Sequence, residues 1–420
     1  MDQTILLITY KRLDITELEA ENIVGDGYRA VDAVAALAGG KTMEPGIIYH
    51  FNGMGSSALI PPPESKKYTI KLALREETLR FSLIRTPTFA TARPLLLIET
   101  SPFSQSKLSC HPDVLSVCPC KPKAYPARVE AGSPDTGDSP PPTLEAEWNL
   151  AMIRANGRFA REYSGKGSRI ALLDTGIAYH KDLAVKGGVS FCEGDADFRS
   201  DPFGHGTHCA GIVAGRQGGI ARDADLFSIK VADKKEGATP IAILAGMGWA
   251  LRKRMNVVSI SLAGAADRKL MPAFANAVQA LMAGHCLVVA STGDEHKDVG
   301  FPANTAGVIA VGGCDRQRMI LDRTGIGGKG NHLTVVAPGQ DITTTFHKND
   351  GYMKTFSGSS AAAPHVAGLA ALIHEKFRGV TPLQVTSRIL ASAQPVNIGP
   401  NQKDVLGGAM LIDCDKALSS

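Results

Sequence analysis

The 420-residue sequence has few aromatic residues, little net charge and no long apolar run. Phe, Trp and Tyr together make up 6%, whereas glycine occurs 44 times, as expected for a chain with many tight turns. The formal net charge of +4 is too small to indicate a nucleic-acid partner or a membrane surface. No segment reaches the roughly 18 apolar residues of a membrane span, so the sequence also argues against a membrane protein.

The N-terminus and the cysteines bear on the cellular compartment. Residues 1–8 have no basic start, only a short apolar run and no small-residue cleavage site, so we expect no signal peptide. If Met1 is the true start, the protein is expected to be cytoplasmic or exported without a signal peptide. Most of the eight cysteines lie in contexts typical of reduced, buried thiols. Cys110, Cys118 and Cys120 could bind zinc or form a disulfide, but a single Cys-x-Cys is a weak metal signal.

The segment FSGSSAAAPHVAG (residues 356–368) places Ser360 before an apolar run that is typical of a buried helix. A helix N-terminus offers free backbone N–H groups, and its dipole favours negative charge. Acyl transfer needs such a site beside its nucleophile, because the tetrahedral intermediate carries an oxyanion. A serine after glycine is also ordinary N-cap chemistry, so this segment alone leaves catalysis and capping equally open.

Two further segments supply an acid and a base. RIALLD (residues 169–174) is typical of a buried parallel strand that brings Asp174 to the ligand-binding edge of an open α/β sheet, although aspartate also favours turns. GHGTHCAG (residues 204–211) puts His205 between two glycines, which leave room for a substrate backbone. A lone histidine there would more often be a helix-start residue without chemistry. In a triad of these residues with Ser360, the acid orients the imidazole and the imidazole takes the serine proton.

The chain order Asp, His, Ser and the three motifs resemble the subtilases, serine peptidases of the subtilisin superfamily. The resemblance covers about residues 148–418 and departs slightly at Ser359, where Thr is usual, and at Ala361, where Met is common. It implies a serine endopeptidase whose substrate is a polypeptide. We expect no metal and no other cofactor; calcium is possible in this family, but no acidic cluster clearly matches its calcium sites.

Composition divides the chain into three parts. Residues 1–124 combine a helix-like stretch (17–37) with strand-like ones, which predicts a smaller α+β domain; the strand candidates are 46–51, 68–74, 78–84 and 95–99. Near its end, HPDVLSV (111–117) resembles the closing strand of a subtilase propeptide, although the region is longer than usual and residues 1–60 fit poorly. The Pro-rich residues 125–142 are typical of an exposed linker, and residues 143–420 carry all three motifs.

An inhibitor-like domain, a cleavable linker and a peptidase domain form the layout of a zymogen. We therefore predict a self-inhibited precursor that cleaves itself in the linker, where proteolysis concentrates. The N-terminal domain is then the inhibitor of its own catalytic domain. The alternative is an ordinary tether between two domains.

Apolar strands alternate with helical stretches from residue 143 onward. This alternation predicts an α/β domain with a doubly wound parallel sheet and helices on both faces. The expected strands are 170–173, 226–231, 257–262, 286–290, 308–311 and 333–336. The expected helices are 206–214, 241–252, 271–283, 364–376 and 382–392.

The resemblance also implies a substrate-binding strand. In subtilases the segment that matches residues 259–264 pairs with the substrate as an added strand, which recognises backbone rather than sequence. Small side chains at its end permit that approach, and a glycine lies on the opposite wall. The substrate-binding residues expected from this resemblance are Ser261, Leu262, Ala263, Gly264 and Gly293.

Asp294 is the main departure from the family pattern. Subtilases have Asn at this position, and its amide donates a hydrogen bond to the oxyanion. An ionised Asp cannot donate and repels the developing charge. Loss of one such donor lowers turnover by about 10²–10³-fold, as measured in subtilisin. At least one branch of the related proprotein convertases carries Asp here and is active, and a carboxylic acid kept neutral by its surroundings can donate.

Three readings of the function follow. The leading one is a serine endopeptidase made as a self-inhibited precursor. The second is a pseudo-protease that binds peptides or a partner, with Asp294 marking lost catalysis; the intact triad residues argue against it. The third is an esterase, which the chain order and the substrate strand disfavour.

Overall fold

The computed structural model describes residues 147–192, 195–233, 237–264, 270–295, 298–325, 333–397 and 410–419, together with residues 140–142 and seven strands before them. These strands are β1 (Thr4–Tyr10), β2 (Arg29–Ala30), β3 (Tyr68–Ile70), β4 (Leu79–Phe81), β5 (Leu83–Ile84), β6 (Leu95–Thr100) and β7 (Val114–Pro119).

The N-terminal strands confirm part of the predicted pattern. Strands occur at the candidates 68–74, 78–84 and 95–99, and β7 overlaps the propeptide-like segment 111–117 at residues 114–117. Four of them pair antiparallel in the order β2-β6-β1-β7. The helix predicted over residues 17–37 is wrong at Arg29–Ala30, because these residues pair with β6. Its other residues, and the strand candidate 46–51, lie outside the described residues.

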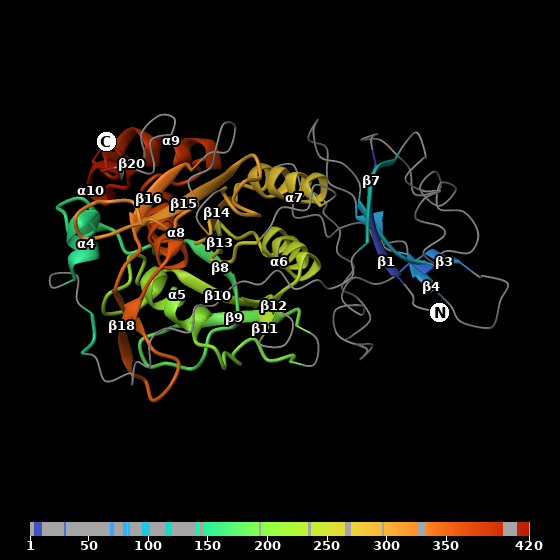
Figure 1. Cartoon of the computed structure of the whole chain (residues 1–420), viewed down its shortest axis with the longest axis horizontal. Coiled ribbons are helices and arrows are strands. Elements are labelled where there is room, and N and C mark those ends of the chain that lie inside the picture. The colour runs from blue at the N-terminus through green and yellow to red at the C-terminus, as the bar shows by residue number, and fades with distance from the viewer. Residues whose placement is uncertain are drawn as a thin grey trace.

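A nine-stranded sheet forms the centre of the C-terminal part (Figure 1). Its order is β19-β20-β16-β15-β14-β13-β8-β10-β9, and every neighbouring pair is parallel except β19–β20. The predicted parallel sheet is therefore confirmed. Its strands are β8 (Arg169–Asp174), β9 (Val185–Ser190), β10 (Asp225–Lys230), β13 (Val257–Ile260), β14 (Leu287–Ser291), β15 (Val308–Cys314), β16 (Val335–Pro338), β19 (Gln394–Pro395) and β20 (Met410–Leu411).

Helices cover both faces of this sheet, as predicted. The pair α6 (Pro240–Arg252) and α7 (Met271–Ala283) packs on one face. The helices α5 (His205–Ala214), α8 (Ser359–Lys376) and α9 (Pro382–Ser392) share the other face with the short helices α4 (Trp148–Met152) and α10 (Cys414–Ala417).

The alternation of side chains along β8 explains the two-sided core. Ile170 and Leu172 belong to the cluster with α5 and α8, whereas Ala171 and Leu173 belong to the cluster with α6 and α7. All four side chains are buried, because a strand between two helical layers has no solvent face. Burial of each large aliphatic side chain stabilises the fold by about 1.5–3 kcal/mol.

Two predicted elements have other bounds in the structure, and several strands were not predicted. The helix expected to begin at residue 364 begins five residues earlier at Ser359, because the preceding small residues are also helical. The strand expected over 257–262 ends at Ile260. The sequence analysis also missed the edge strand β9 and two antiparallel pairs; these are β11 (Ala232–Asp233) with β12 (Gly237–Ala238), and β17 (Ile342–Thr345) with β18 (Tyr352–Phe356).

The connectivity reverses at β8. The chain goes from β8 to β9 and β10 on one side of the sheet, then crosses to β13 and continues through β14 and β15 on the other side. Ligands of open α/β sheets bind beyond the carboxyl ends of the strands at such a switch point. We therefore expect a binding site at the loops that follow β8, β13 and β14.

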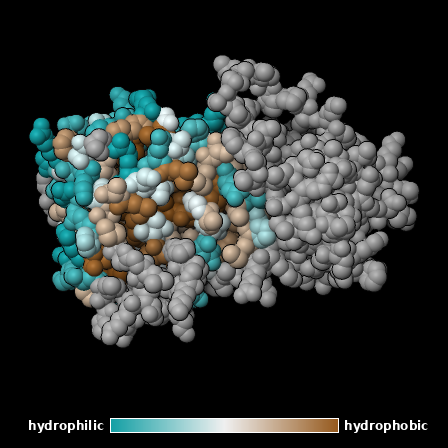
Figure 2. Space-filling model, turned by 90° about the horizontal axis from the view of Figure 1, so that it is seen from above, coloured by the Kyte–Doolittle hydropathy of each residue, from teal (hydrophilic) through white to brown (hydrophobic). Residues whose placement is uncertain are grey.

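The surface of the described part is mixed. Figure 2 shows hydrophobic residues gathered near the middle of the face seen from above, with hydrophilic residues toward its edges. Large apolar side chains that are exposed include Leu383 and Leu390, both on α9. None of the helices in the described ranges combines the length and hydropathy needed to span a bilayer.

Candidate active site

Asp174 and His205 form a buried pair at the switch point. Asp174 is the last residue of β8, and His205 is the first residue of α5. His205 Nδ1 lies 2.7 Å from Asp174 Oδ1, and the two side chains are 4% and 1% exposed. The carboxylate therefore fixes the tautomer of the imidazole with the proton on Nδ1, which leaves Nε2 as the basic nitrogen.

The charge of Asp174 controls the basicity of His205. Burial by itself lowers the pKa of the imidazole, because it disfavours the charged form. The negative charge and hydrogen bond of Asp174 outweigh burial and raise the pKa well above its usual 6.5. An imidazole in this setting is a strong base that needs neutral to alkaline pH to be unprotonated.

Ser360 lies at the N-terminus of α8, the longest helix of the described residues. The first turn of a helix leaves its N–H groups without intrahelical acceptors, so the backbone N–H of Ser360 is available to an anion. The residue before this turn, Gly358, has φ 114°, a conformation that glycine adopts readily and other residues avoid.

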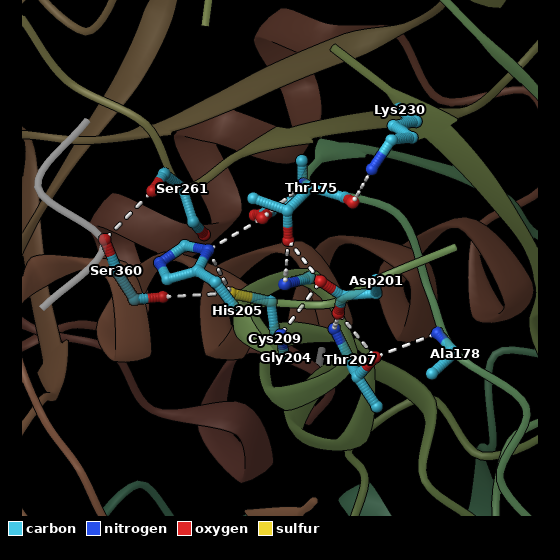
Figure 3. A network of polar contacts seen from close by, with 12 residues as sticks. Thr175, Ala178, Asp201, Gly204, His205, Thr207, Cys209, Lys230, Ser261 and Ser360 are labelled. Carbon is cyan, nitrogen blue, oxygen red and sulfur yellow. Dashed lines mark hydrogen bonds and ion pairs between the residues drawn. The ribbon is translucent and has the colours of Figure 1, made fainter. Parts of the chain in front are cut away.

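The hydroxyl of Ser360 does not hydrogen-bond His205 in this structure. Ser360 Oγ donates instead to the backbone carbonyl of Ser261, at 2.9 Å. Figure 3 shows the imidazole of His205 beside Ser360, so a rotation of the serine side chain can bring its hydroxyl toward the ring. Catalytic hydrogen bonds are often long or misaligned before substrate binds.

Cys209 connects α5 to α8 beneath these residues. Its sulfur lies 3.9 Å from His205 Nδ1 and donates to the carbonyl of Ser360 at 3.6 Å. Pro364 has no N–H to donate to that carbonyl, although it stands four residues further along the helix. The thiol therefore provides a donor for a carbonyl that the proline leaves open. Burial raises the pKa of Cys209, so the thiol remains protonated.

A network of polar groups lies beside the Asp174–His205 pair, to the right of His205 in Figure 3. It is centred on the buried carboxylate of Asp201 and the buried ammonium of Lys230. Thr175, directly after Asp174, contacts both of them. The sequence analysis missed these residues, although a lysine inside a strand expected to be buried was a visible signal.

Asp294 lies beside the N-terminus of α8. Its Oδ1 accepts a hydrogen bond from the backbone N–H of Ser359 at 2.9 Å. A Cβ added to Gly358 would lie 2.6 Å from Asp294 Oδ2, so only glycine lets the carboxylate come this close. The group that stands where an oxyanion donor is expected is therefore a hydrogen-bond acceptor adjacent to Ser360.

The five residues predicted to bind substrate lie around the same place. Ser261 and Leu262 are buried, and Ala263 and Gly264 are half-buried. A Cβ on Gly293 would lie 3.0 Å from that of Ala263, so the two residues face each other. Gly264 exchanges two backbone hydrogen bonds with Phe301, at 3.0 and 2.9 Å, so a substrate strand would have to pair with the residues before it.

Among the described residues, one group of three acidic, histidine and cysteine side chains lies close enough together to share a metal ion. The side-chain ligand atoms of Asp174, His205 and Cys209 lie within 4.8 Å of one another. The carboxylate and the imidazole already bond each other, and the thiol is protonated, which a metal would have to reverse. The candidate zinc or disulfide residues before residue 124 lie outside the described side chains. As predicted, the cysteines of the C-terminal part form no disulfide; they are Cys192, Cys209, Cys286, Cys314 and Cys414.

A family model gives an independent comparison. The model described as "Subtilase family" matches residues 165–408, more than half of the chain. This range contains the three motifs, the substrate strand and Asp294.

Individual proteins agree with the family model. The chain is 34% identical over 263 residues to subtilisin DY of Bacillus licheniformis, which covers 60% of this chain and 92% of that protein. It is 33% identical over 251 residues to a thermostable alkaline protease of Halalkalibacterium halodurans, covering 59% of this chain and 67% of that protein. A crystal structure of a cold-adapted subtilisin-like serine proteinase matches with a TM-score of 0.54 and 27% identity, over 60% of this chain and 90% of that one.

Proposed function

Because the chain belongs to the subtilase family, we propose that its endopeptidase chemistry is carried by Asp174, His205 and Ser360. The family membership, the similar proteases and the shared fold make the protein a serine endopeptidase with a subtilisin-like catalytic domain.

One observation carries the assignment of the triad. The buried hydrogen bond between His205 and Asp174 ends in an imidazole that lies next to a serine at a helix N-terminus. No second pair of this kind occurs among the ion pairs of the described ranges. A base held by a buried carboxylate beside a hydroxyl and free N–H groups is the arrangement that acyl transfer requires.

The proposed reaction begins when the hydroxyl of Ser360 leaves the carbonyl of Ser261 and turns toward His205. Nε2 takes the serine proton while Oγ attacks the carbonyl carbon of the peptide, and Asp174 stabilises the imidazolium that forms. The imidazolium then gives the proton to the leaving amine. Water, activated by the same imidazole, hydrolyses the acyl-enzyme and restores Ser360.

The oxyanion is stabilised by an incomplete set of donors in this proposal. The backbone N–H of Ser360 points from the N-terminus of α8 and supplies one donor. Asp294 supplies a second only while its carboxyl group is protonated. Turnover is therefore slower than an asparagine at this position would allow.

We also propose that the protein is made as a self-inhibited precursor of a peptidase that acts on extended polypeptides. The support is the propeptide-like segment that forms β7, followed by the Pro-rich linker and the catalytic domain. Residues 1–124, added as a separate polypeptide, should inhibit the processed enzyme. No effect on initial rates at tens of micromolar would contradict this part of the proposal.

Hydrolysis of a fluorogenic peptide library tests the catalytic assignment. Ser360→Ala should abolish cleavage and leave the precursor at full length in mass spectra taken over time. Ser357→Ala, three residues earlier and half-buried, is the matched control. This variant should still cleave the peptides and still shorten its own precursor. Cleavage that persists in Ser360→Ala would refute the assignment, and wild-type protein that cleaves nothing would favour a peptide-binding pseudo-protease.

A further inference from the structure

Asp201 is a buried carboxylate whose hydrogen-bonding capacity is fully used. It lies in the loop before α5 and is 5% exposed. Oδ1 accepts from Gly204 N at 2.9 Å and from the hydroxyl of Thr175 at 2.8 Å. Oδ2 accepts from the backbone N and the hydroxyl of Thr207, at 2.9 and 2.6 Å. A single carboxylate thus binds the segment after Asp174 and both sides of His205.

The hydroxyl of Thr175 continues this connection. It donates to Asp201 and accepts from the backbone N–H of Gly206 at 2.9 Å. The backbone N–H of Thr175 donates to Asp174 Oδ1 at 2.7 Å, the same oxygen that bonds His205. The residues on both sides of the catalytic histidine are therefore tied to the residue that follows the catalytic aspartate.

Lys230 holds the other side of these loops. It is the last residue of β10, pairs in register with Asp174, and is among the largest fully buried side chains of the described residues. Its ammonium donates to the carbonyls of Thr175 at 2.7 Å and Ser200 at 2.9 Å, and lies 3.4 Å from a carboxylate oxygen of Asp195. Ser200 directly precedes Asp201, so the ammonium joins the same two segments that Asp201 joins.

We propose that Asp201 and Lys230 are positioning residues for the catalytic base. Neither touches the reacting atoms; together they fix the two backbone segments whose separation sets the Asp174–His205 hydrogen bond. The catalytic consequence rests on the proposed function, whereas the effect on the hydrogen bond does not. Burial of two charges is costly unless each is fully hydrogen-bonded, as both are here.

Substitution of Asp201 by asparagine separates positioning from packing. Asparagine has the same shape, but one carboxylate oxygen is replaced by an amide NH2 group, which cannot accept a hydrogen bond. The two N–H or O–H groups that donate to this oxygen would then point at another donor. A displacement of about 1 Å at a catalytic group lowers turnover by about 10²-fold. Asp201→Asn should therefore lower kcat by about that factor and leave KM within about twofold, because the substrate strand is untouched.

Asp182→Asn is the matched control. Asp182 is also a buried aspartate, 3% exposed, and its Oδ1 accepts from the backbone N–H of Gln217. It makes no hydrogen bond to the Asp174 or His205 segments among those of the described residues. This variant keeps the acceptor for Gln217 and removes the charge of a second buried aspartate, so it should leave kcat nearly unchanged. Equal losses of kcat in the two variants would show that the effect of Asp201→Asn is not specific to the Asp174–His205 pair.

Proton NMR provides a readout that does not depend on activity. In a Ser360→Ala background, the proton shared by His205 Nδ1 and Asp174 should give a low-field resonance. Asp201→Asn should shift or broaden this resonance, and Asp182→Asn should not. An unchanged resonance in Asp201→Asn would overturn the proposal even if the enzyme is active, whereas an inactive wild type would count against the proposed function alone.

A double-mutant cycle tests the route through Thr175. Thr175→Val removes the hydroxyl between Asp201 and Gly206 and keeps the side-chain shape. The kcat losses of Thr175→Val and Asp201→Asn should be clearly less than additive, because both break the same connection. Lys230→Met should show the same selective loss of kcat; if it fails to fold, the NMR comparison of the Asp201 variants still decides. Additive losses would refute this route.

Discussion

The two sides of the active site are held in different ways. On the side of Asp174 and His205, hydrogen bonds from Asp174, Thr175 and Asp201 already hold the start of α5. On the side of Ser360, the hydroxyl bonds a backbone carbonyl and Asp294 presents a carboxylate to the start of α8. The Asp174–His205 hydrogen bond is therefore formed before substrate arrives, whereas Ser360 still needs a rotation of its side chain and the oxyanion a second donor.

Two buried histidines, one on each side of the site, have pKa values shifted in opposite directions. His205 has its pKa raised, because the charge of Asp174 outweighs burial. His365, on α8 behind Ser360, has its pKa lowered to about 4 by burial, since its partners are the neutral groups Asn149 and Ala361. The charge of Asp174 thus makes a base of one buried histidine, whereas His365, with neutral partners only, stays uncharged until the pH approaches 4.

The largest loss of activity is expected when the hydrogen bond between Asp174 and His205 is disrupted. Asp174→Asn should lower kcat by about 10⁴-fold, because the amide favours the wrong imidazole tautomer. The residual activity should also rise with pH at a lower midpoint, since the charge that raises the pKa of His205 is gone. Steady-state kinetics from pH 5 to 10 measure both. A loss below tenfold, or an unshifted midpoint, would contradict the assigned role.

A second hydrogen-bond donor for the oxyanion, next to Ser360, should raise activity. Asp294→Asn keeps an oxygen for the N–H of Ser359 and adds an amide donor for the oxyanion. Turnover at pH 8 should rise about tenfold or more. Steady-state kinetics at pH 8 and at pH 6 measure this gain.

Asp298→Asn, an exposed acid in the same loop, controls for the loss of charge and should change turnover little. If Asp294→Asn lowers turnover at both pH values, the carboxylate has another role and the second donor must be sought elsewhere.

The neutral histidines should make the fold sensitive to acid. His365 and His374 both have their pKa lowered to about 4, chiefly by burial. Above pH 6.5 neither the folded nor the unfolded form is protonated at these positions, so stability is unaffected. Between pH 6.5 and 4 only the unfolded chain takes up the protons, and each histidine lowers the free energy of unfolding by about 1.4 kcal/mol per pH unit.

Denaturant unfolding of Ser360→Ala between pH 7 and 4 measures this loss. His365→Gln can keep both hydrogen bonds and does not titrate, so it should reduce the pH dependence by the contribution of one histidine. A pH dependence identical to that of the parent would show that His365 does not remain neutral in the folded protein.

The smallest effect on activity is expected at Cys209, which contacts both His205 and the carbonyl of Ser360. Cys209→Ala removes a weak donor from the carbonyl of Ser360. We expect kcat/KM to change less than about threefold and stability to fall by about 1 kcal/mol, the size of one hydrogen bond. A change of kcat/KM above tenfold would give the thiol a part in the chemistry.

The sequence predicted the sheet and most helices of the catalytic domain because short apolar strands and longer apolar helical stretches alternate clearly along it. The start of α8 was misplaced because Pro364 suggested a first turn, although proline is also tolerated further inside when another group satisfies the carbonyl it leaves open. The hairpin of β17 and β18 was missed because its polar residues lack the apolar run of a core strand.

The supporting residues of the site were less predictable. Asp201 and Lys230 lie 27 and 56 positions after Asp174, and nothing local in the sequence indicates that they meet at Thr175. A buried lysine becomes explicable only when the carbonyls that it binds are placed by the fold. The direction in which Ser360 points was equally inaccessible, since it depends on the carbonyl of Ser261.

Labelling with a fluorophosphonate tests the central claim most directly, because the reagent forms a bond only with a serine activated by a base. Peptide mapping of the labelled wild-type protein should place the reagent on Ser360. Ser360→Ala should take up none, and His205→Ala should react at least about 10³-fold more slowly. Label on another serine, or equal labelling of Ser360→Ala, would contradict the account.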